Sequence, residues 1–184
     1  PNKASVSGPA TAQQGTTALV TYPGSEYAGS VTTYATLPSI STIGYTSIQL
    51  EIQRWLGIKK QGGSTDYARV QYSLNGTTWT DVTSHSNLIE TNWAAQTYSL
   101  PVAAENKSLV YLRFSLETDA NNHSFGWNID DLKITSASSA AFPPSFTSTA
   151  ITTATQGQAY GYTITTTDSD TPGASLVLAA TGLP

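Results

Sequence analysis

Hydrophobic and polar residues alternate in several stretches of the chain with a period of two residues. In the clearest stretch, residues 68–74, Ala, Val, Tyr and Leu share one face, while Arg, Gln and Ser share the other. This period predicts a β-strand that turns one face toward a core. The Asn75-Gly76 pair that follows predicts a tight hairpin turn, because both residues tolerate positive φ, and it places a return strand at residues 77–82.

The same alternation predicts most of the remaining strands. Clear candidates are residues 47–58, 109–116 and 127–134, and weaker ones are 18–22, 30–36 and 95–100. No amphipathic stretch with the helical period is longer than two turns. About eight strands over roughly 130 residues are typical of a two-sheet jelly roll.

A change of composition marks the end of these strands. Residues 135–141 are small and uncharged, as in a linker, and Pro143-Pro144 stiffens the chain that follows. Alternation then returns near Tyr160 and Leu176, in a segment shorter than the ~100 residues of a complete immunoglobulin-type domain. We therefore predict an all-β chain: a two-sheet jelly-roll sandwich in residues 1–134, a linker in 135–143, and an incomplete immunoglobulin-like β unit in 144–184.

Composition narrows the classes of function. Charged residues make up 11% of the chain, against about 25% in average domains, and the scattered Lys and Arg residues argue against nucleic-acid binding. The chain has no cysteine, and therefore no thiol nucleophile, disulfide or zinc–thiolate site. No apolar run reaches the ~18 residues of a membrane span. These properties favour a secreted or cell-surface protein, expected to be bacterial and to be a processed piece of a longer precursor.

Four segments follow one another in the first two thirds of the chain. They are residues 50–56 (LEIQRWL), 66–79 (DYARVQYSLNGTTW), 110–114 (VYLRF) and 126–132 (GWNIDDL). Together they resemble the MAM-like, galactose-binding-like jelly-roll modules of large bacterial extracellular proteins, over roughly residues 10–135. In such modules the Asp-Asp strand often contributes to a structural calcium site, and some relatives bind glycans or other proteins.

The tail carries a second resemblance. Residues 144–160, the Asp168-Ser169-Asp170 triplet and the final residues 181–184 resemble the first half of the putative-Ig, or dystroglycan-type cadherin-like, repeats of bacterial adhesins. Such repeats continue beyond the Gly-Leu-Pro at which this one stops. Strands without closing partners expose a sheet edge, so we expect a neighbouring chain to complete them by β-augmentation.

The predicted strand at residues 127–134 changes phase at its centre. Its inward positions are Trp127, Ile129, Leu132 and Ile134. The slip of one residue predicts a β-bulge at Asp130 and Asp131 that turns both carboxylates toward one rim. Two adjacent carboxylates repel each other unless a cation lies between them, and oxygen ligands favour Ca²⁺. The alternative is a solvated pair that protects an edge strand.

A calcium ion held by this pair needs further oxygen ligands. Glu26 is taken as the third ligand, and Asp66, Asp119 and backbone carbonyls are candidates to complete the shell. Asp168 and Asp170 form a second oxygen-rich spacing, similar to the inter-repeat calcium sites of cadherin-like arrays, although Asp is also frequent in turns. The predicted cofactor is structural Ca²⁺, and its predicted ligands are Asp130, Asp131, Glu26, Asp168 and Asp170.

Aromatic rings and hydrogen-bond donors fall on the outward side of the central strands. Flat rings with nearby donors are what sugar binding requires, so this side is a candidate ligand face. The sequence leaves open whether its strands are neighbours, and ordinary cross-strand pairing is the alternative explanation. The predicted ligand-binding residues are Trp55, Tyr67, Arg69, Gln71, Tyr111 and Arg113.

Patterns of catalytic residues are missing from the sequence. His85 and His123 are both expected in loops, and neither has a partner at the spacing of a metal site or a catalytic triad. There is no Gly-x-Ser-x-Gly motif and no phosphate-binding glycine loop. We therefore expect a non-catalytic, calcium-stabilised surface module that acts in adhesion or in binding of glycan or protein. The alternative is a structural subunit of an extracellular fibre or surface layer, with copies of itself as partners.

Overall fold

Nearly all the regular secondary structure of the chain is β-strand. The computed structural model describes residues 8–61, 64–121, 123–138 and 145–168, and the chain divides into two units, Pro1–Ser138 and Ser139–Pro184. Within the described residues, the regular structure is β-strand except for one short 3₁₀ turn, η1 (Val102–Ala104). The predicted all-β class is therefore confirmed.

Two antiparallel sheets make up the first unit. Sheet A has the order β1–β11–β3–β8, with β9 also paired to β3; its strands are β1 (Leu19–Val20), β3 (Tyr45–Ile58), β8 (Leu88–Ile89), β9 (Ala94–Ser99) and β11 (Gly126–Ser138). Sheet B has the order β2–β10–β6–β7; its strands are β2 (Thr32–Thr36), β6 (Tyr67–Ser73), β7 (Thr80–His85) and β10 (Tyr111–Glu117). A short hairpin of β4 (Lys60–Gln61) and β5 (Ser64–Thr65) joins β3 to β6.

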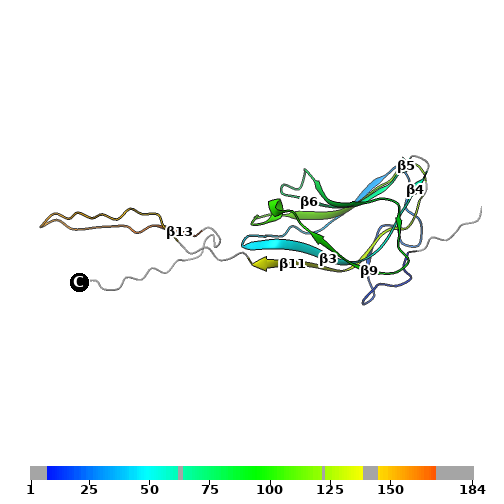
Figure 1. Ribbon diagram of the computed structural model, residues 1–184, viewed down its shortest axis with the longest axis horizontal. Helices are drawn as coiled ribbons and strands as arrows, with labels where there is room; N and C mark the ends of the chain where they lie inside the picture. The colour runs from blue at the N-terminus through cyan, green and yellow to red at the C-terminus, as the bar shows by residue number, and fades with distance from the viewer. Residues whose placement is uncertain (1–7, 62–63, 122, 139–144, 169–184) are drawn as a thin grey trace, which may run out of the picture. The chain divides into compact units, whose positions relative to one another are not determined.

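The two sheets pack face to face, with β6 on one side and β3, β9 and β11 on the other (Figure 1). The chain crosses repeatedly between them: β1 lies in sheet A, β2 in sheet B, β3 in A, β6 and β7 in B, β8 and β9 in A, β10 in B and β11 in A. Such a course is that of a jelly roll. The predicted two-sheet sandwich is confirmed.

The core lies between the sheets and follows from the alternation. The inward residues of β3 are buried, while Gln49, Glu51 and Gln53 on its other face are partly exposed. Fully burying one aliphatic or aromatic side chain stabilises the fold by about 1.5–3 kcal/mol. The central buried side chains are Ile48, Leu50, Ile52 and Leu56 of β3, Val70 of β6, Leu112, Phe114 and Leu116 of β10, and Trp127 and Ile129 of β11.

The hairpin after β6 is longer than the sequence predicts. Strand β7 begins at Thr80 rather than at residue 77, because side chains close the loop over residues 74–79. The Ser73 hydroxyl accepts a hydrogen bond from the Gly76 amide at 2.9 Å, and Asn75 Oδ1 accepts one from the Thr78 amide at 2.8 Å. Only Gly76 of the pair has a positive φ, +74°, so the turn is not the expected two-residue type.

Strand β11 runs past the predicted end of the sandwich. Thr135, Ala137 and Ser138 pair with β3, so residues 135–138 of the predicted linker are strand. The hydrogen-bonding partners offered by the long strand β3 outweigh the small, polar composition of this segment. Residues 139–143 of the predicted linker lie outside the described residues.

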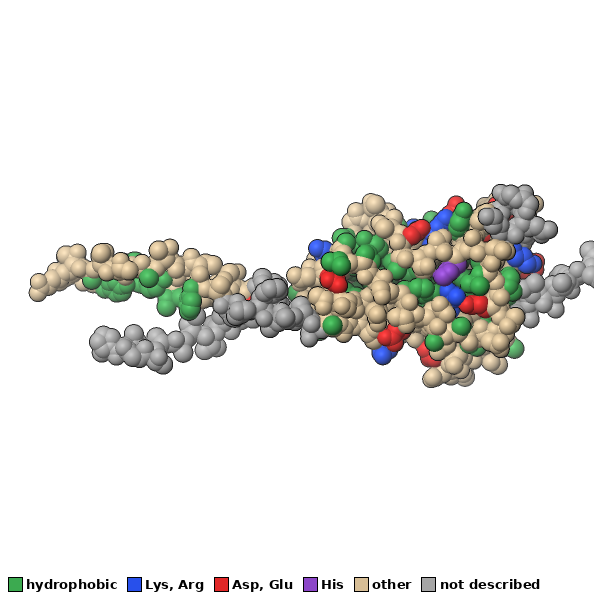
Figure 2. All heavy atoms as spheres, viewed as in Figure 1, with side chains coloured by type: hydrophobic (Ala, Val, Ile, Leu, Met, Phe, Trp, Pro, Cys, Tyr) green, Lys and Arg blue, Asp and Glu red, His purple; other side chains and the backbone are tan. Residues whose placement is uncertain are grey.

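The second unit has little regular structure among its described residues. Strand β12 (Ser145–Phe146) pairs with β13 (Thr166–Thr167) in a two-stranded sheet, and the Thr147 amide donates to the Thr165 carbonyl at 2.8 Å. The predicted alternation near Tyr160 is not a strand, and Leu176 lies outside the described residues. We call the described part of this unit, residues 145–168, the β12–β13 arm. Hydrophobic side chains lie along it (Figure 2), and its exposed large hydrophobic residues are Phe146, Ile151, Tyr160 and Ile164.

Candidate functional site

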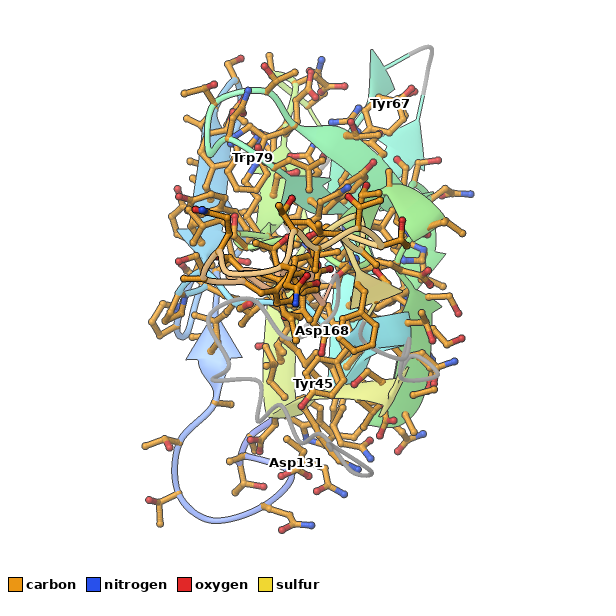
Figure 3. All side chains as sticks on the ribbon, turned by 90° about the vertical axis from the view of Figure 1, so that its left-hand side faces the viewer. Tyr45, Tyr67, Trp79, Asp131 and Asp168 are labelled. Atoms are coloured by element: carbon orange, nitrogen blue, oxygen red, sulfur yellow. The ribbon has the colours of Figure 1, made fainter. Side chains whose placement is uncertain are left out.

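The outer face of sheet B brings together five of the six predicted ligand-binding residues. Strands β6 and β10 are neighbours, and their register places Arg113 opposite Gln71 and Glu117 opposite Tyr67. Tyr67, Arg69 and Gln71 of β6 therefore share one face with Tyr111 and Arg113 of β10. We call this surface the sheet B face. Figure 3 shows Tyr67 and Trp79 on this side of the sandwich.

Arg113 lies at the centre of the sheet B face. Its guanidinium carbon lies 4.0 Å from the ring centroid of Tyr34 and 4.0 Å from that of Trp79. The two rings come from opposite sides of β10, since Tyr34 belongs to β2 and Trp79 to the loop after β6. The guanidinium Nε donates to Gln71 Oε1 at 2.8 Å. Burial is the largest effect on the pKa of Arg113, and it lowers that pKa.

Arg69 has a different environment on the same face. Its guanidinium forms ion pairs with Asp81 and with Glu117, and it lies over the ring of Tyr67, 4.3 Å from the centroid. Asp81 also accepts a hydrogen bond from Gln71 Nε2 at 2.7 Å. Two carboxylates therefore balance Arg69, and one of them is linked through Gln71 to Arg113.

Two members of the sheet B face were not predicted. Tyr34 and Trp79 flank Arg113, and neither stands out in the sequence because cross-strand register and a six-residue loop bring them there. Tyr111 has a supporting role, since its ring packs against Gly76 of that loop, where an added Cβ would lie 3.5 Å from Tyr111 Cζ. The cross-strand register of alternating strands is the signal that would have found Tyr34.

Trp55 does not belong to the sheet B face. It lies on β3 in sheet A, where its Cα partner is Asn128 and its ring meets the ring of Trp93 edge-on at 6.1 Å. The prediction that Trp55 joins the other five residues is therefore wrong. The period of two gives the face of a strand but does not give the sheet to which the strand belongs.

The β-bulge predicted at the two Asp residues of β11 is present. Asp130 pairs with Gln53 and Lys133 with Glu51, so two residues of β11 face one residue of β3. Asp131 adopts a left-handed conformation with φ of 49°. Leu132, expected to point inward, is 40% exposed, because the bulge holds it at the rim. Figure 3 shows Asp131 on the side opposite the sheet B face.

The carboxylate of Asp130 accepts hydrogen bonds from three backbone amides. Its Oδ2 accepts hydrogen bonds from the amides of Gln13 and Gln14 at 2.8 and 3.0 Å, and its Oδ1 accepts one from the Asp131 amide at 2.8 Å. The hydrogen bond from Gln14 is the largest cause of a lowered pKa of Asp130. These contacts give Asp130 a structural role, in which it ties the N-terminal segment to the bulge.

Three further residues were predicted as calcium ligands. Glu26 is exposed in the loop between β1 and β2, and among the described residues no group of three His, Cys, Asp or Glu side chains could hold a metal, so Glu26 does not form such a group with Asp130 and Asp131. Asp168 follows β13 in the second unit, and Asp170 lies outside the described residues.

A second pair of acidic residues, the buried Asp66 and the partly exposed Asp119, lies at one corner of the sandwich. Asp66 is 1% exposed; its Oδ1 accepts a hydrogen bond from the Asp119 amide at 2.8 Å, and its Oδ2 accepts one from the Tyr27 hydroxyl at 2.6 Å. Burial, followed by the hydrogen bond to Asp66, raises the pKa of Tyr27. Asp119 Oδ2, His123 Nε2 and Ser124 Oγ are buried there without a hydrogen-bond partner.

The unpaired oxygens of Asp119 and Ser124 at this corner are of the kind that a hard cation binds. Buried polar atoms are normally paired, and no lysine or arginine in the described ranges forms an ion pair with Asp66 or Asp119. Ca²⁺ binds carboxylate, hydroxyl and backbone carbonyl oxygens, so Asp66, Asp119 and Ser124 would hold it. No group of three or more His, Cys, Asp and Glu side chains arranged for a metal occurs among the described residues, so hydroxyl and carbonyl oxygens would have to complete the shell.

A buried polar cluster lies between the sheets. Arg54 of β3 is 4% exposed; its Nε donates to both oxygens of Glu90 at 3.1 Å, and its Nη1 donates to the Tyr98 hydroxyl at 2.7 Å. The same Nη1 lies 3.0 Å from His85 Nε2. Glu90 Oε2 also accepts a hydrogen bond from the Leu56 amide at 2.6 Å.

His85 was expected in a loop, but it is the last residue of β7. Arginine nitrogens only donate hydrogen bonds, so His85 Nε2 accepts and the imidazole is neutral. Burial first, and then the charge of Arg54, lower the pKa of His85. Burial alone would lower the pKa of Arg54, but the hydrogen bonds to Glu90 and Tyr98 outweigh it and raise that pKa.

Two cavities adjoin the core at the open sides of the sandwich. One, of about 160 Å³, lies between the edge strands β1 and β2 over Phe114 and Trp127. The other, of about 200 Å³, lies beside Tyr45 and Ile134. Neither is lined by an acidic, basic or histidine side chain.

No protein-family model matches the chain, and no curated protein matches it. In the described part of the chain, no helix is long and apolar enough to span a membrane. The class that the fold and the site define is an all-β sandwich with an aromatic and charged face on one sheet.

Proposed function

We propose that this protein is a non-catalytic extracellular surface module that binds a glycan on the sheet B face. The observation that carries the proposal is the central guanidinium of Arg113 with the rings of Tyr34 and Trp79 on either side. Sugar rings stack on flat aromatic surfaces, and their hydroxyls take hydrogen bonds from fixed donors and acceptors such as the side chains of Gln71 and Arg113.

The rigidity of the face supports this function. Ion pairs and hydrogen bonds link Arg69, Asp81, Gln71 and Arg113 across three strands. A side chain already held in place loses little conformational entropy when a ligand binds.

A glycan array with two matched tryptophan variants tests the proposal. The wild-type chain should be retained on a subset of glycans. Trp79→Ala should lose this retention, whereas Trp55→Ala, on the other sheet, should keep it. Retention on no glycan, or equal loss in both variants with unchanged melting temperatures, would contradict binding on the sheet B face.

The proposed module is also stabilised by calcium at the Asp66–Asp119 corner. A cation there would satisfy the unpaired Asp119 Oδ2 and stabilise the folded state by mass action. Added Ca²⁺ should raise the melting temperature of the wild-type chain and of Asp131→Asn. In Asp119→Asn, the Ca²⁺-dependent increase should disappear. An increase that Asp131→Asn removes and Asp119→Asn keeps would place the ion at the bulge instead.

A structural subunit of a fibre or surface layer is the second candidate function. The observation in its favour is the exposed hydrophobic side chains along the β12–β13 arm, among them Phe146, which is 71% exposed. Sheet edges and apolar faces of this kind accept a strand from a neighbouring chain. Sedimentation velocity decides: a subunit should form polymers that Phe146→Ser weakens, whereas a binding module should remain monodisperse.

A further inference from the structure

The two arginines of the sheet B face differ in how their charges are balanced. Arg69 has two carboxylates within ion-pair distance, Asp81 and Glu117. Arg113 has none within that distance among the described residues, and its Nε donates to the neutral Gln71. The charge of Asp81 also acts on Arg113, but its Oδ1 accepts from Gln71 and its Oδ2 pairs with Arg69. Of the two arginines, Arg113 is therefore the one whose guanidinium has no carboxylate in direct contact.

The guanidinium of Arg113 is also held in one orientation. The rings of Tyr34 and Trp79 lie on either side of it, and Nε is fixed by Gln71. Of the five N–H groups of an arginine, the four on the terminal nitrogens have no carboxylate partner. A planar fork of this kind matches the two oxygens of a carboxylate.

We infer that Arg113 binds the carboxylate of an acidic saccharide, with Tyr34 and Trp79 stacking on the sugar rings to either side. The ligand class is thus a glycan that contains uronic or sialic acid residues rather than a neutral one. This inference rests on the proposed glycan-binding function and adds the chemical class of the ligand. The formal net charge of the chain is −4, so an anionic ligand gains no general attraction and depends on this unbalanced cation.

The surroundings of Arg113 favour a saccharide over an acidic peptide. The sheet B face carries hydroxyl side chains at Thr32 and Thr36 of β2 and at Ser84 of β7, which is the Cα partner of Arg69. The central strands β6 and β10 have strand neighbours on both sides, so their backbone groups are paired. A peptide bound over these strands could not form backbone hydrogen bonds with them, whereas a sugar binds through ring stacking and hydroxyl hydrogen bonds.

The test compares acidic oligosaccharides with their methyl esters, which keep the shape and remove the charge. The full wild-type chain is titrated with each form of an oligogalacturonate and of a sialylated lactose. We expect the acid form of at least one to bind about tenfold or more tightly than its ester, as charge-assisted bidentate hydrogen bonds allow. Raising the salt concentration should weaken the acid form more than the ester.

Variants then assign the preference to one residue. Arg113→Gln should bind acid and ester equally, and Arg113→Lys should retain a reduced preference because it keeps the charge and loses the fork. Lys133→Gln, which removes the same charge from the other sheet, should keep the full preference. The comparison of acid and ester on the wild-type chain needs no variant, so a destabilised Arg113 variant does not decide the question.

The possible failures are distinct. Equal wild-type binding of acid and ester, abolished by Trp79→Ala, would overturn the acidic ligand class and leave the proposed glycan-binding function standing. A preference for the acid that Arg113→Gln retains would overturn the assignment to Arg113. Binding to no oligosaccharide in either form would overturn both.

Discussion

Arg54 and Arg113 are both strand residues that lie against aromatic rings and polar partners, yet they occupy opposite environments. Arg54 lies between the sheets, where Glu90, Tyr98 and His85 surround its guanidinium. Arg113 lies on the outside of sheet B, with two rings and one amide around it.

The difference between the two arginines separates stability from binding. A buried charge must be paired within the protein, because its desolvation is otherwise too costly, and all three guanidinium nitrogens of Arg54 already have partners inside the protein. A partly exposed charge can remain unbalanced in the free protein, since water solvates it. The interior cluster therefore serves the fold, and the outer arginine is free to serve a ligand.

The largest expected effect comes from breaking the interior pair. Glu90→Gln leaves the charge of Arg54 buried without a counter-ion, which should lower the free energy of unfolding by about 3–5 kcal/mol. Urea denaturation followed by tryptophan fluorescence measures this, since all four tryptophans belong to the first unit.

The matched control is Glu117→Gln, which removes an exposed carboxylate from the ion pair with the partly exposed Arg69. It should cost less than about 1 kcal/mol, as exposed pairs do. Equal losses in the two variants would show that the interior and exterior charges do not differ as described.

The next largest effect concerns the buried acidic corner. Tyr27→Phe removes the hydroxyl that donates to Asp66 Oδ2 at 2.6 Å, and a buried acceptor left with fewer partners should cost about 1–3 kcal/mol. Tyr45→Phe, in which the altered ring is 47% exposed, should change stability by less than about 0.5 kcal/mol. A small loss in Tyr27→Phe would mean that water or a cation replaces the hydroxyl.

A smaller effect should appear as pH falls. The pKa of His85 in the folded state is below its ordinary value of 6.5 because of burial and the charge of Arg54. The unfolded chain therefore binds a proton before the folded chain does, so stability is complete above pH 6.5 and is lost as pH falls below it. Denaturation at pH 7.5 and 5.5 measures this loss, which His85→Gln should reduce; an unchanged loss would assign it to other groups.

The smallest effect is expected at the bulge. Asp130→Asn weakens the hydrogen bonds that hold the amides of Gln13 and Gln14, but the site is on the surface, so stability should change by about 0.5 kcal/mol or less. Hydrogen exchange at these two amides should nevertheless become faster. Unchanged exchange rates would show that the carboxylate does not tie down this segment.

Local sequence patterns correctly predicted the features that depend on a single strand. The period of two gave the strands and their faces, and the phase slip between Ile129 and Leu132 gave the bulge. The buried cluster was not predicted, although Arg54 is in phase with Ile52 and Leu56, and a charged residue at an inward position is the signal that could have indicated it.

Features that depend on pairing between distant segments were not predictable in this way. Glu90 meets Arg54 from 36 positions away, and Trp79 meets Arg113 because a side-chain-closed loop delays the start of β7. For the same reason the sequence could not show that Trp55 lies in a different sheet from the other five residues. The calcium prediction rested on adjacent carboxylates, and the sequence gives no sign that the Asp66 carboxylate is buried or that Asp119 Oδ2 has no hydrogen-bond partner.

Mapping of an acidic oligosaccharide onto the full chain by NMR tests the central claim most directly. If the sheet B face binds the ligand, then the Nε–H of Arg113, the indole N–H of Trp79 and the amides of β6 and β10 should shift together during the titration, while the Nε–H of Arg54 and the indole N–H of Trp55 stay in place. Shifts confined to sheet A, or to the loops around Asp119, would contradict the account.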